Sequence, residues 1–444
     1  MRIRQTTQTL SRTVHPLPAT LLIAATLLLA AAPHAGAQTA RDEITGNIRL
    51  SAGTAAAYLS PLPDDIRAPE RKRAFYISHY GRHGSRFLVG RDEYEEAYSV
   101  LAAADRAGAL SPIGKDVMRR TDRLRAEASG RYGELTPLGW RQMSDIAERM
   151  CGRFPDVFAP GAVIDAHSTT VLRCVLSMTA AMTRIVALHP GVAAACTASA
   201  AEADYMSYND KSPRTEAEDR GAKQATNDFR NATAHTTNTV AALFTDSLYV
   251  AANVNVPKLY DRLLTLAHSV QSSSLRTQLT LYDLFDDNEL YDAWQKENAA
   301  RYMSCAAAAR SADRQPTSPQ RLLKRIIADA DSAIARDTPG ATLRFGHDSA
   351  LLPLLYLMDI NGAGRAVERP EDIDAKGWAD YRLSPMAANV QLVFFRENPK
   401  DTDIVVLALL NETAATMPLP TDIAPYYHWA DVRAYLSALA GKDE

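Results

Sequence analysis

The chain has 444 residues, of which 46% are hydrophobic and 23% are charged, and its formal net charge is −3. This composition is that of an ordinary globular protein and excludes a low-complexity or disordered chain. The length allows one large domain with an insert, or two domains. The weakly acidic balance argues against nucleic acid or an anionic membrane surface as a partner, although a local arginine cluster could still hold a polyanionic substrate.

The first 37 residues have the features of a secretory signal peptide. Three arginines precede an apolar run at 21–32, and Ala35–Ala37 has the small residues of a cleavage site. A transmembrane anchor is the alternative, but twelve apolar residues are too few to span a bilayer. We therefore expect cleavage between Ala37 and Gln38 and a soluble mature protein in the periplasm or the medium. Without the signal's three arginines, 46 Lys and Arg face 52 Asp and Glu.

Four cysteines would enter an oxidising compartment after export. They are Cys151, Cys174, Cys196 and Cys305. No C-x-x-C spacing occurs, so neither a zinc site nor a redox motif is supported. Four cysteines allow three pairings, and buried free thiols are an equal alternative to one or two disulfides.

Stretches with strand character alternate with helical patterns along the chain. The expected strands are residues 73–79, 162–166, 341–345, 389–396 and 404–410. The expected helices are residues 92–108, 113–129, 137–152, 170–188, 350–358 and 429–439. Between them, residues 196–339 are rich in alanine and charge and lack strand signals, with 282–302 as a clear helix. This order predicts an α/β core of 50–195 and 340–444, with 196–339 inserted as an all-helical cap.

The segment Arg82–Arg86 (RHGSR) follows the first expected strand and is the most informative motif of the chain. Arg82 and Arg86 can bind the peripheral oxygens of a phosphoryl group, because a guanidinium fork matches their geometry. Gly84 lets the backbone approach closely. His83, between the arginines, can then serve as an imidazole nucleophile that needs no metal. The alternative is a surface loop that happens to be basic.

A second pair, His347-Asp348, follows another strand and precedes an apolar helix. Asp348 could protonate a leaving alcohol, while His347 could donate to the transferring phosphoryl group. The alternative role for Asp348 is that of a helix cap. Both motifs fall at the carboxyl ends of strands, where the ligand crevice of an α/β sheet lies, and this placement favours catalysis.

Arg173 lies about one turn inside the helix expected at 170–188. A single arginine on a helix is usually solvent-exposed. Ser168 and Thr169 are, however, plausible N-caps, and they would direct the helix N-terminus, with its partial positive charge, toward the same crevice.

Together these residues resemble the histidine acid phosphatases, the second branch of the histidine phosphatase superfamily. The likeness covers most of the mature chain, including the Leu135–Gly139 helix start and Phe345–Asp348. It implies a three-layer, phosphoglycerate-mutase-like α/β sandwich with a helical cap, and no cofactor or metal. It also implies site roles. The nucleophile would be His83, the phosphate ligands Arg82, Arg86, Arg173 and His347, and the acid Asp348.

Within that family, Tyr76–Arg86 looks most like the multiple inositol polyphosphate phosphatases, including bacterial phytase-like members, and so does Leu409–Glu412. That subfamily usually has His-Ala-Glu where this chain has His347-Asp348-Ser349. The resemblance thus implies a phosphomonoester hydrolase that acts on inositol polyphosphates. The alternative is a sugar-phosphate or broad-specificity acid phosphatase.

Two other classes of protein remain open. A phosphomutase would use the same phosphohistidine, although export argues against it. A non-catalytic polyanion-binding protein would need the arginines but not His83 with Asp348. Four basic residues of the insert could extend a polyanion site, although acidic neighbours also fit a solvated surface. They are Lys211, Arg214, Arg220 and Lys223.

Overall fold

The computed structural model describes residues 39–59, 66–206, 238–310, 318–367 and 369–441. The expected signal peptide and its cleavage site lie outside these residues, as do Lys211, Arg214, Arg220 and Lys223. The described residues from Ala40 onward form one compact unit. In the described part, no helix is both long and apolar enough to cross a membrane.

A single mixed sheet organises the fold, in the order β3-β2-β4-β1-β5-β6-β7, with β8 also paired to β6. Its strands are β1 (Arg73–Arg82), β2 (Val163–Ser168), β3 (Ala193–Ala198), β4 (Gly340–Gly346), β5 (Asn389–Arg396), β6 (Val405–Leu410), β7 (Thr413–Ala414) and β8 (Tyr426–His428). The strands from β3 to β1 are parallel, and β5 joins β1 antiparallel. The five expected strands are present.

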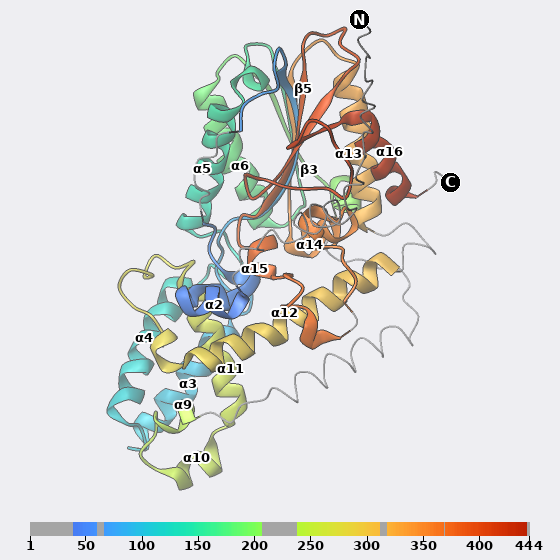
Figure 1. Cartoon of the computed structure of the whole chain (residues 1–444). Helices are drawn as coiled ribbons and strands as arrows, with labels where there is room; N and C mark the ends of the chain where they lie inside the picture. Colours follow the sequence, from blue (N-terminus) through green and yellow to red (C-terminus); the bar gives the residue numbers. More distant parts are fainter. Residues whose placement is uncertain (1–38, 60–65, 207–237, 311–317, 368, 442–444) are drawn as a thin grey trace, which may run out of the picture. The chain divides into compact units, whose positions relative to one another are not determined.

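Helices cover both faces of this sheet, as Figure 1 shows. One layer contains α5 (Pro137–Arg153) and α6 (Leu172–Leu188), and the other contains α13 (Ser318–Ile334), α14 (Asp348–Leu357) and α16 (Trp429–Ala440). Strand β6 explains why both layers are needed, because its alternate side chains are apolar on both faces and all are buried. The expected three-layer sandwich is therefore confirmed.

A second group of helices packs around its own apolar cluster (Figure 1). It contains α3 (Asp92–Arg106), α4 (Pro112–Ala128), α9 (Asn238–Ala241), α10 (Ser247–Asn253) and α11 (Val256–Val270). The sequence predicts that the first two of these helices belong to the α/β core at 50–195. Their amphipathic faces instead meet α11, because Leu101, Leu124 and Leu263 share one core.

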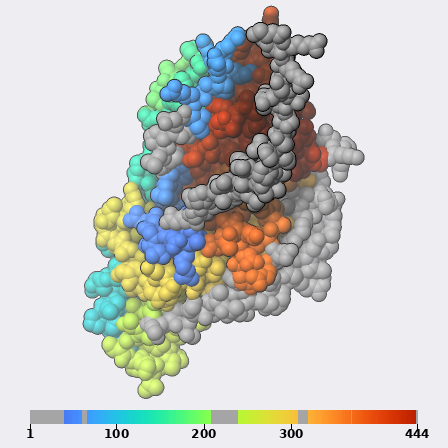
Figure 2. Space-filling model, viewed as in Figure 1, coloured from blue at the N-terminus to red at the C-terminus, as the bar shows by residue number. Residues whose placement is uncertain are grey.

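The segment before β1 packs against two further helices. It forms α2 (Ala40–Gly46) and the 3₁₀ helix η1 (Ile48–Ala55), which pack on α12 (Asp287–Arg310) and α15 (Asp380–Leu383) around Trp294. In Figure 2 this segment is the dark blue surface beside the yellow and orange elements. The short helix α7 (Ala200–Tyr205) follows β3.

Candidate active site

His83 follows the last residue of β1 and is held inside the protein. Its backbone N–H donates to the carbonyl of Gly346, at the end of β4, at 2.9 Å, and the residue is 1% exposed. Its Nδ1 lies 2.9 Å from the carbonyl oxygen of Gly84. Because a carbonyl can only accept, Nδ1 carries the hydrogen and Nε2 keeps its lone pair. Burial, and then the charges of Arg82 and Arg173, lower the pKa of His83 well below its usual value, so the ring is neutral.

The loop after His83 is fixed by two helices of one layer. The Gly84 N–H donates to Ser177 Oγ of α6 at 3.1 Å, and Ser177 donates in turn to the Arg173 carbonyl at 2.7 Å. On its other side Gly84 touches Gly139 of α5 so closely that a Cβ at position 84 would lie 2.5 Å from the Gly139 oxygen. Glycine is therefore required at this contact, and the position of His83 depends on both helices.

Three arginines surround the imidazole. Arg82 is 3% exposed and donates to the carbonyls of Thr54 and Ser384, while Arg86 donates to the carbonyl of Phe87. Arg173 enters from the second residue of α6. In each guanidinium the Nε–H is buried and has no acceptor among the described residues. Because buried donors favour an acceptor and cations favour an anion, these arginines can bind a phosphoryl group.

His347 lies directly after β4 and faces His83. The two rings are 5.5 Å apart between centroids and nearly perpendicular, and His347 is buried. Cys174 lies beside it, with Sγ 3.6 Å from Nε2 and 3.3 Å from the Gly346 carbonyl. Burial, followed by the charge of Arg173, lowers the pKa of His347 to about 3. A neutral His347 can offer one ring N–H to a bound phosphoryl oxygen.

Asp348 is the first residue of α14 and does not cap it: the cap position is His347, which makes no side-chain cap bond. The Asp348 carboxylate instead lies 3.5 Å from Arg82 Nη2 and 3.2 Å from Arg301 Nη1. Burial raises the pKa of Asp348, but Arg82 and Arg301 outweigh burial and hold the pKa below its usual value. The carboxylate is thus ionised in this state.

Arg301 of α12 was not identified from the sequence. Its Nη1 binds Asp348, and its Nε lies 3.9 Å from Oδ2 of Asp380, a carboxylate that is 1% exposed. Asp380 is held by the Trp294 indole N–H at 2.9 Å and by the Thr54 N–H at 3.2 Å. Arg301 therefore joins a helix of the 196–339 segment to the carboxylate beside Arg82.

The prediction that Ser168 and Thr169 cap the following helix is wrong. Helix α6 begins after Val171, which has no side-chain cap bond, and the hydroxyl of Ser168 donates to the carbonyl of Thr169. The chain turns between β2 and α6, so these residues lie too far upstream to reach the first free N–H groups of the helix. Arg173 is consequently nearer the helix N-terminus than expected.

All six residues named from the sequence meet where β1, β4 and β2 end. No group of three or more described His, Cys, Asp or Glu side chains has the geometry of a metal site. Within the described residues none of the four cysteines is in a disulfide; Cys151, Cys174 and Cys305 are buried, and Cys196 is exposed. Burial raises the pKa of Cys174 to about 11, so this thiol beside His347 stays protonated.

Comparisons of the fold identify similar solved structures. The multiple inositol polyphosphate phosphatase of Bifidobacterium longum, in complex with inositol hexasulfate, matches with a TM-score of 0.66 at 18% identity, over 87% of this chain and 97% of that chain. Its apo form matches with a TM-score of 0.68 at 16% identity and the same coverage. The phytase from D. castellii matches with a TM-score of 0.62 at 11% identity, over 88% of this chain and 85% of that chain.

No protein-family model matches the sequence, and no curated protein sequence matches it. At these identities the structural likeness establishes the fold. The fold implied by the resemblance to the histidine acid phosphatases is thereby confirmed.

Proposed function

We propose that this protein is a phosphoric monoester hydrolase of the histidine acid phosphatase type that forms a phosphohistidine on His83. The observation that carries the proposal is a neutral, buried imidazole, with Nδ1 on the Gly84 carbonyl, among three arginines with unsatisfied Nε–H groups. An unprotonated Nε2 is a nucleophile, and the arginines offset the charge that the phosphoryl group spreads over its oxygens during transfer.

The reaction has two steps. In the first, the lone pair of His83 Nε2 forms a bond to phosphorus while the ester P–O bond breaks, and the leaving oxygen takes a proton from Asp348. In the second, water attacks phosphorus, the N–P bond breaks, and the Asp348 carboxylate accepts a proton from the water. His347 donates its ring N–H to a phosphoryl oxygen in both steps.

The acid role requires that Asp348 hold a proton in the substrate complex, although Arg82 and Arg301 keep it ionised without substrate. A phosphate dianion between Arg82 and Arg173 offsets their positive charge, which raises the pKa of the nearby carboxyl. An acidic medium favours the same protonated form and leaves His83 neutral, since its pKa is depressed. We therefore expect activity at acidic pH.

Inositol polyphosphates, including inositol hexakisphosphate, are the proposed substrates. Support comes from the fold shared with proteins named for inositol polyphosphates and phytate, and from Arg301, which brings a further cation to the site. A sugar-phosphate or broad-specificity acid phosphatase is the second candidate, because the acid is Asp348 rather than glutamate. Export through residues 1–37 belongs to the same proposal, as does a cap role for the helices α9 to α12 of the 196–339 segment, since α13 packs on the sheet.

The test is release of inorganic phosphate from inositol hexakisphosphate, glucose 1-phosphate and a simple aryl phosphate at matched pH and low salt. We expect the highest kcat/KM for inositol hexakisphosphate. A value below both others would assign the protein to the second candidate, and no release from any of them would contradict the hydrolase.

His83→Ala tests the mechanism on the same substrates. We expect turnover to be lost while phosphate affinity is largely kept, because the arginines bind the ground state. His428→Ala, at the opposite end of the sheet on β8, is the matched control and should turn over normally. Wild-type enzyme quenched during turnover should carry acid-labile, base-stable phosphate; full activity without His83, or label on a serine, would contradict the proposal.

A further inference from the structure

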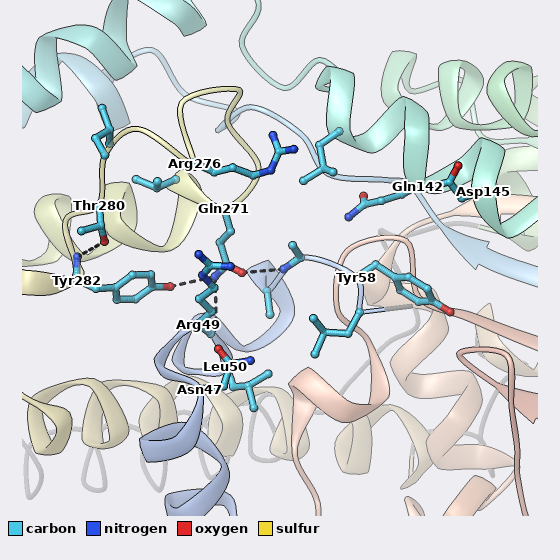
Figure 3. Close-up of a pocket in the computed structure, with 16 residues that line it drawn as sticks. Asn47, Arg49, Leu50, Tyr58, Gln142, Asp145, Gln271, Arg276, Thr280 and Tyr282 are labelled. Atoms are coloured by element: carbon cyan, nitrogen blue, oxygen red, sulfur yellow. Dashed lines mark hydrogen bonds between the residues drawn. The ribbon is translucent and has the colours of Figure 1, made fainter. Parts of the chain in front are cut away.

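A cavity of about 320 Å³ lies apart from the six candidate site residues, none of which lines it (Figure 3). Three segments enclose it: residues 47–59, one side of α5, and the segment 270–282 that begins at the end of α11. Its volume is within the range of small-molecule sites. Much of its wall is apolar, with Leu50, Leu138 and Leu279 among the lining residues, and polar side chains interrupt it.

Gln142 supplies a buried polar group that the fold itself does not satisfy. Its Oε1 accepts the backbone N–H of Ser85 at 2.9 Å, inside the Arg82–Arg86 motif. Because that N–H needs an acceptor, the amide cannot be flipped, and Nε2 must point the other way. The residue is 7% exposed, and Nε2 has no acceptor among the described residues. An amide donor buried in this way calls for an oxygen acceptor.

Two arginines line the same cavity. Arg276 donates to the carbonyl of Ser273 at 3.1 Å, and neither Arg276 nor Arg49 lies within ion-pair distance of a described carboxylate. Figure 3 draws Arg276 and Gln142 extending into the space between α5 and the 270–282 segment. Asp145 is the single acidic residue among the lining side chains. Two cations against one carboxylate leave the cavity positive, which favours an anion.

We propose that this cavity is a second anion site, which takes a small tetrahedral oxyanion such as inorganic phosphate between Gln142 Nε2 and the guanidinium of Arg276. The inference goes beyond the proposed function, since it concerns a site behind the catalytic loop. Arg49 adds a second positive charge to the wall, and the leucines make part of the wall apolar.

The second site is connected to the first through Gln142. One amide group would bind the oxyanion through Nε2 and the Ser85 N–H through Oε1. Ser85 also accepts the Thr136 N–H at 2.9 Å through its carbonyl, so this turn joins the motif to the start of α5. An ion that fixes Gln142 therefore stabilises the backbone that carries His83 and Arg86.

Calorimetric titration of the full chain with inorganic phosphate tests the proposal. We expect two phosphates per wild-type chain, one at each site. Arg276→Gln should bind one, as should the double variant Arg86→Ala/Arg173→Ala, while the combined triple variant should bind none. Arg119→Gln, an exposed arginine of α4, is the matched control and should bind two. Arg276→Gln should also hydrolyse an aryl phosphate within about twofold of the wild-type rate.

Hydrogen exchange in the double variant supplies the second readout. Phosphate should protect the amide of Ser85, and Gln142→Glu should remove this protection, because glutamate keeps an acceptor for Ser85 but replaces the donor with a repelling oxygen. A folded double variant that binds no phosphate, or Arg276→Gln that still binds two, would overturn the second site. If the wild type binds no phosphate at the candidate active site but does bind it at the second site, the proposed function is contradicted and this inference is not.

Discussion

Arg301→Gln most directly tests which of two roles Asp348 has, that of a proton donor or that of a charge partner for the arginines. In the wild type, Arg301 Nη1 lies 3.2 Å from the Asp348 carboxylate, and Arg82 Nη2 lies 3.5 Å away. The substitution removes one of these two cations and keeps a side chain of polar character. Asp348 itself, His83 and the three arginines around the imidazole are unchanged.

The size of the effect follows from Coulomb's law. Two unit charges at this separation interact by about 5 kcal/mol at an effective dielectric constant of about 20. The side chain of Arg301 is 39% exposed, so solvent and salt reduce this figure to about 1–2 kcal/mol. Because 1.36 kcal/mol corresponds to one pKa unit, the pKa of Asp348 should rise by about one unit.

The direction of the pKa shift of Asp348 follows from the charge that the substitution removes. Arg301 stabilises the carboxylate, so its loss favours the protonated acid, and the protonated acid then persists to higher pH. With an alkyl phosphate, the alkaline limb of the kcat profile should therefore move up by about one pH unit. With p-nitrophenyl phosphate, whose leaving group hardly needs a proton, the limb should move little.

The assay is initial-rate phosphate release from both substrates across the acidic and neutral pH range. Arg325→Gln is the matched control, because Arg325 of α13 makes a similar 3.1 Å pair with Asp329. A limb that stays in place, or moves to lower pH, would refute the assignment of Asp348 as the acid held by Arg301.

Three further substitutions test the site. Asp348→Asn should slow alkyl phosphates by about 10²–10⁴-fold and p-nitrophenyl phosphate much less; equal losses in steady-state kcat would leave Asp348 only a positioning role. Ser177→Ala should lower the free energy of unfolding in urea by about 1–3 kcal/mol, because the buried Gly84 N–H loses its acceptor; an unchanged unfolding midpoint would contradict this. Gly84→Ala places a Cβ 2.5 Å from the Gly139 oxygen, so kcat should fall at least tenfold, by roughly 1.4 kcal/mol or more; wild-type kcat would show that the loop tolerates displacement.

The main strands could be predicted because aromatic and β-branched side chains gather in β1 and β5, and because β6 is an unbroken apolar run. Strand β5 has the predicted bounds, and β1 continues three residues beyond its expected end, through Arg82, because Gly81 and Arg82 still pair with β4. Strand β3 gave no signal. Its six residues, AAACTA, are exposed and contain a single β-branched side chain, and they form a strand only because β2 offers a free edge.

The candidate catalytic motif could be recognised because its residues are close together in the sequence. The residues that hold the motif in place are distant from it in the sequence and could not be identified. Arg301 precedes its partner Asp348 by 47 residues and lies in a helix full of charged side chains. Ser177 is one of three hydroxyl residues in a mainly apolar helix, and nothing in its neighbours indicates that it accepts the Gly84 N–H. Such contacts depend on how α6 and α12 pack, and helical periodicity does not determine packing across elements.

The central strand β1 is made early, but both strands that pair with it are synthesised late. Tyr76 pairs with Gly340 on one side and with Phe394 on the other, so both partners are made long after β1 itself. Contacts of such sequence separation slow folding, and an unpaired strand edge invites aggregation until they form. A chain interrupted before Asn389 would contain all six residues of the candidate site and still have β1 exposed along one edge. Loss of residues 389–444, the last eighth of the chain, should therefore yield insoluble protein rather than a weakened enzyme.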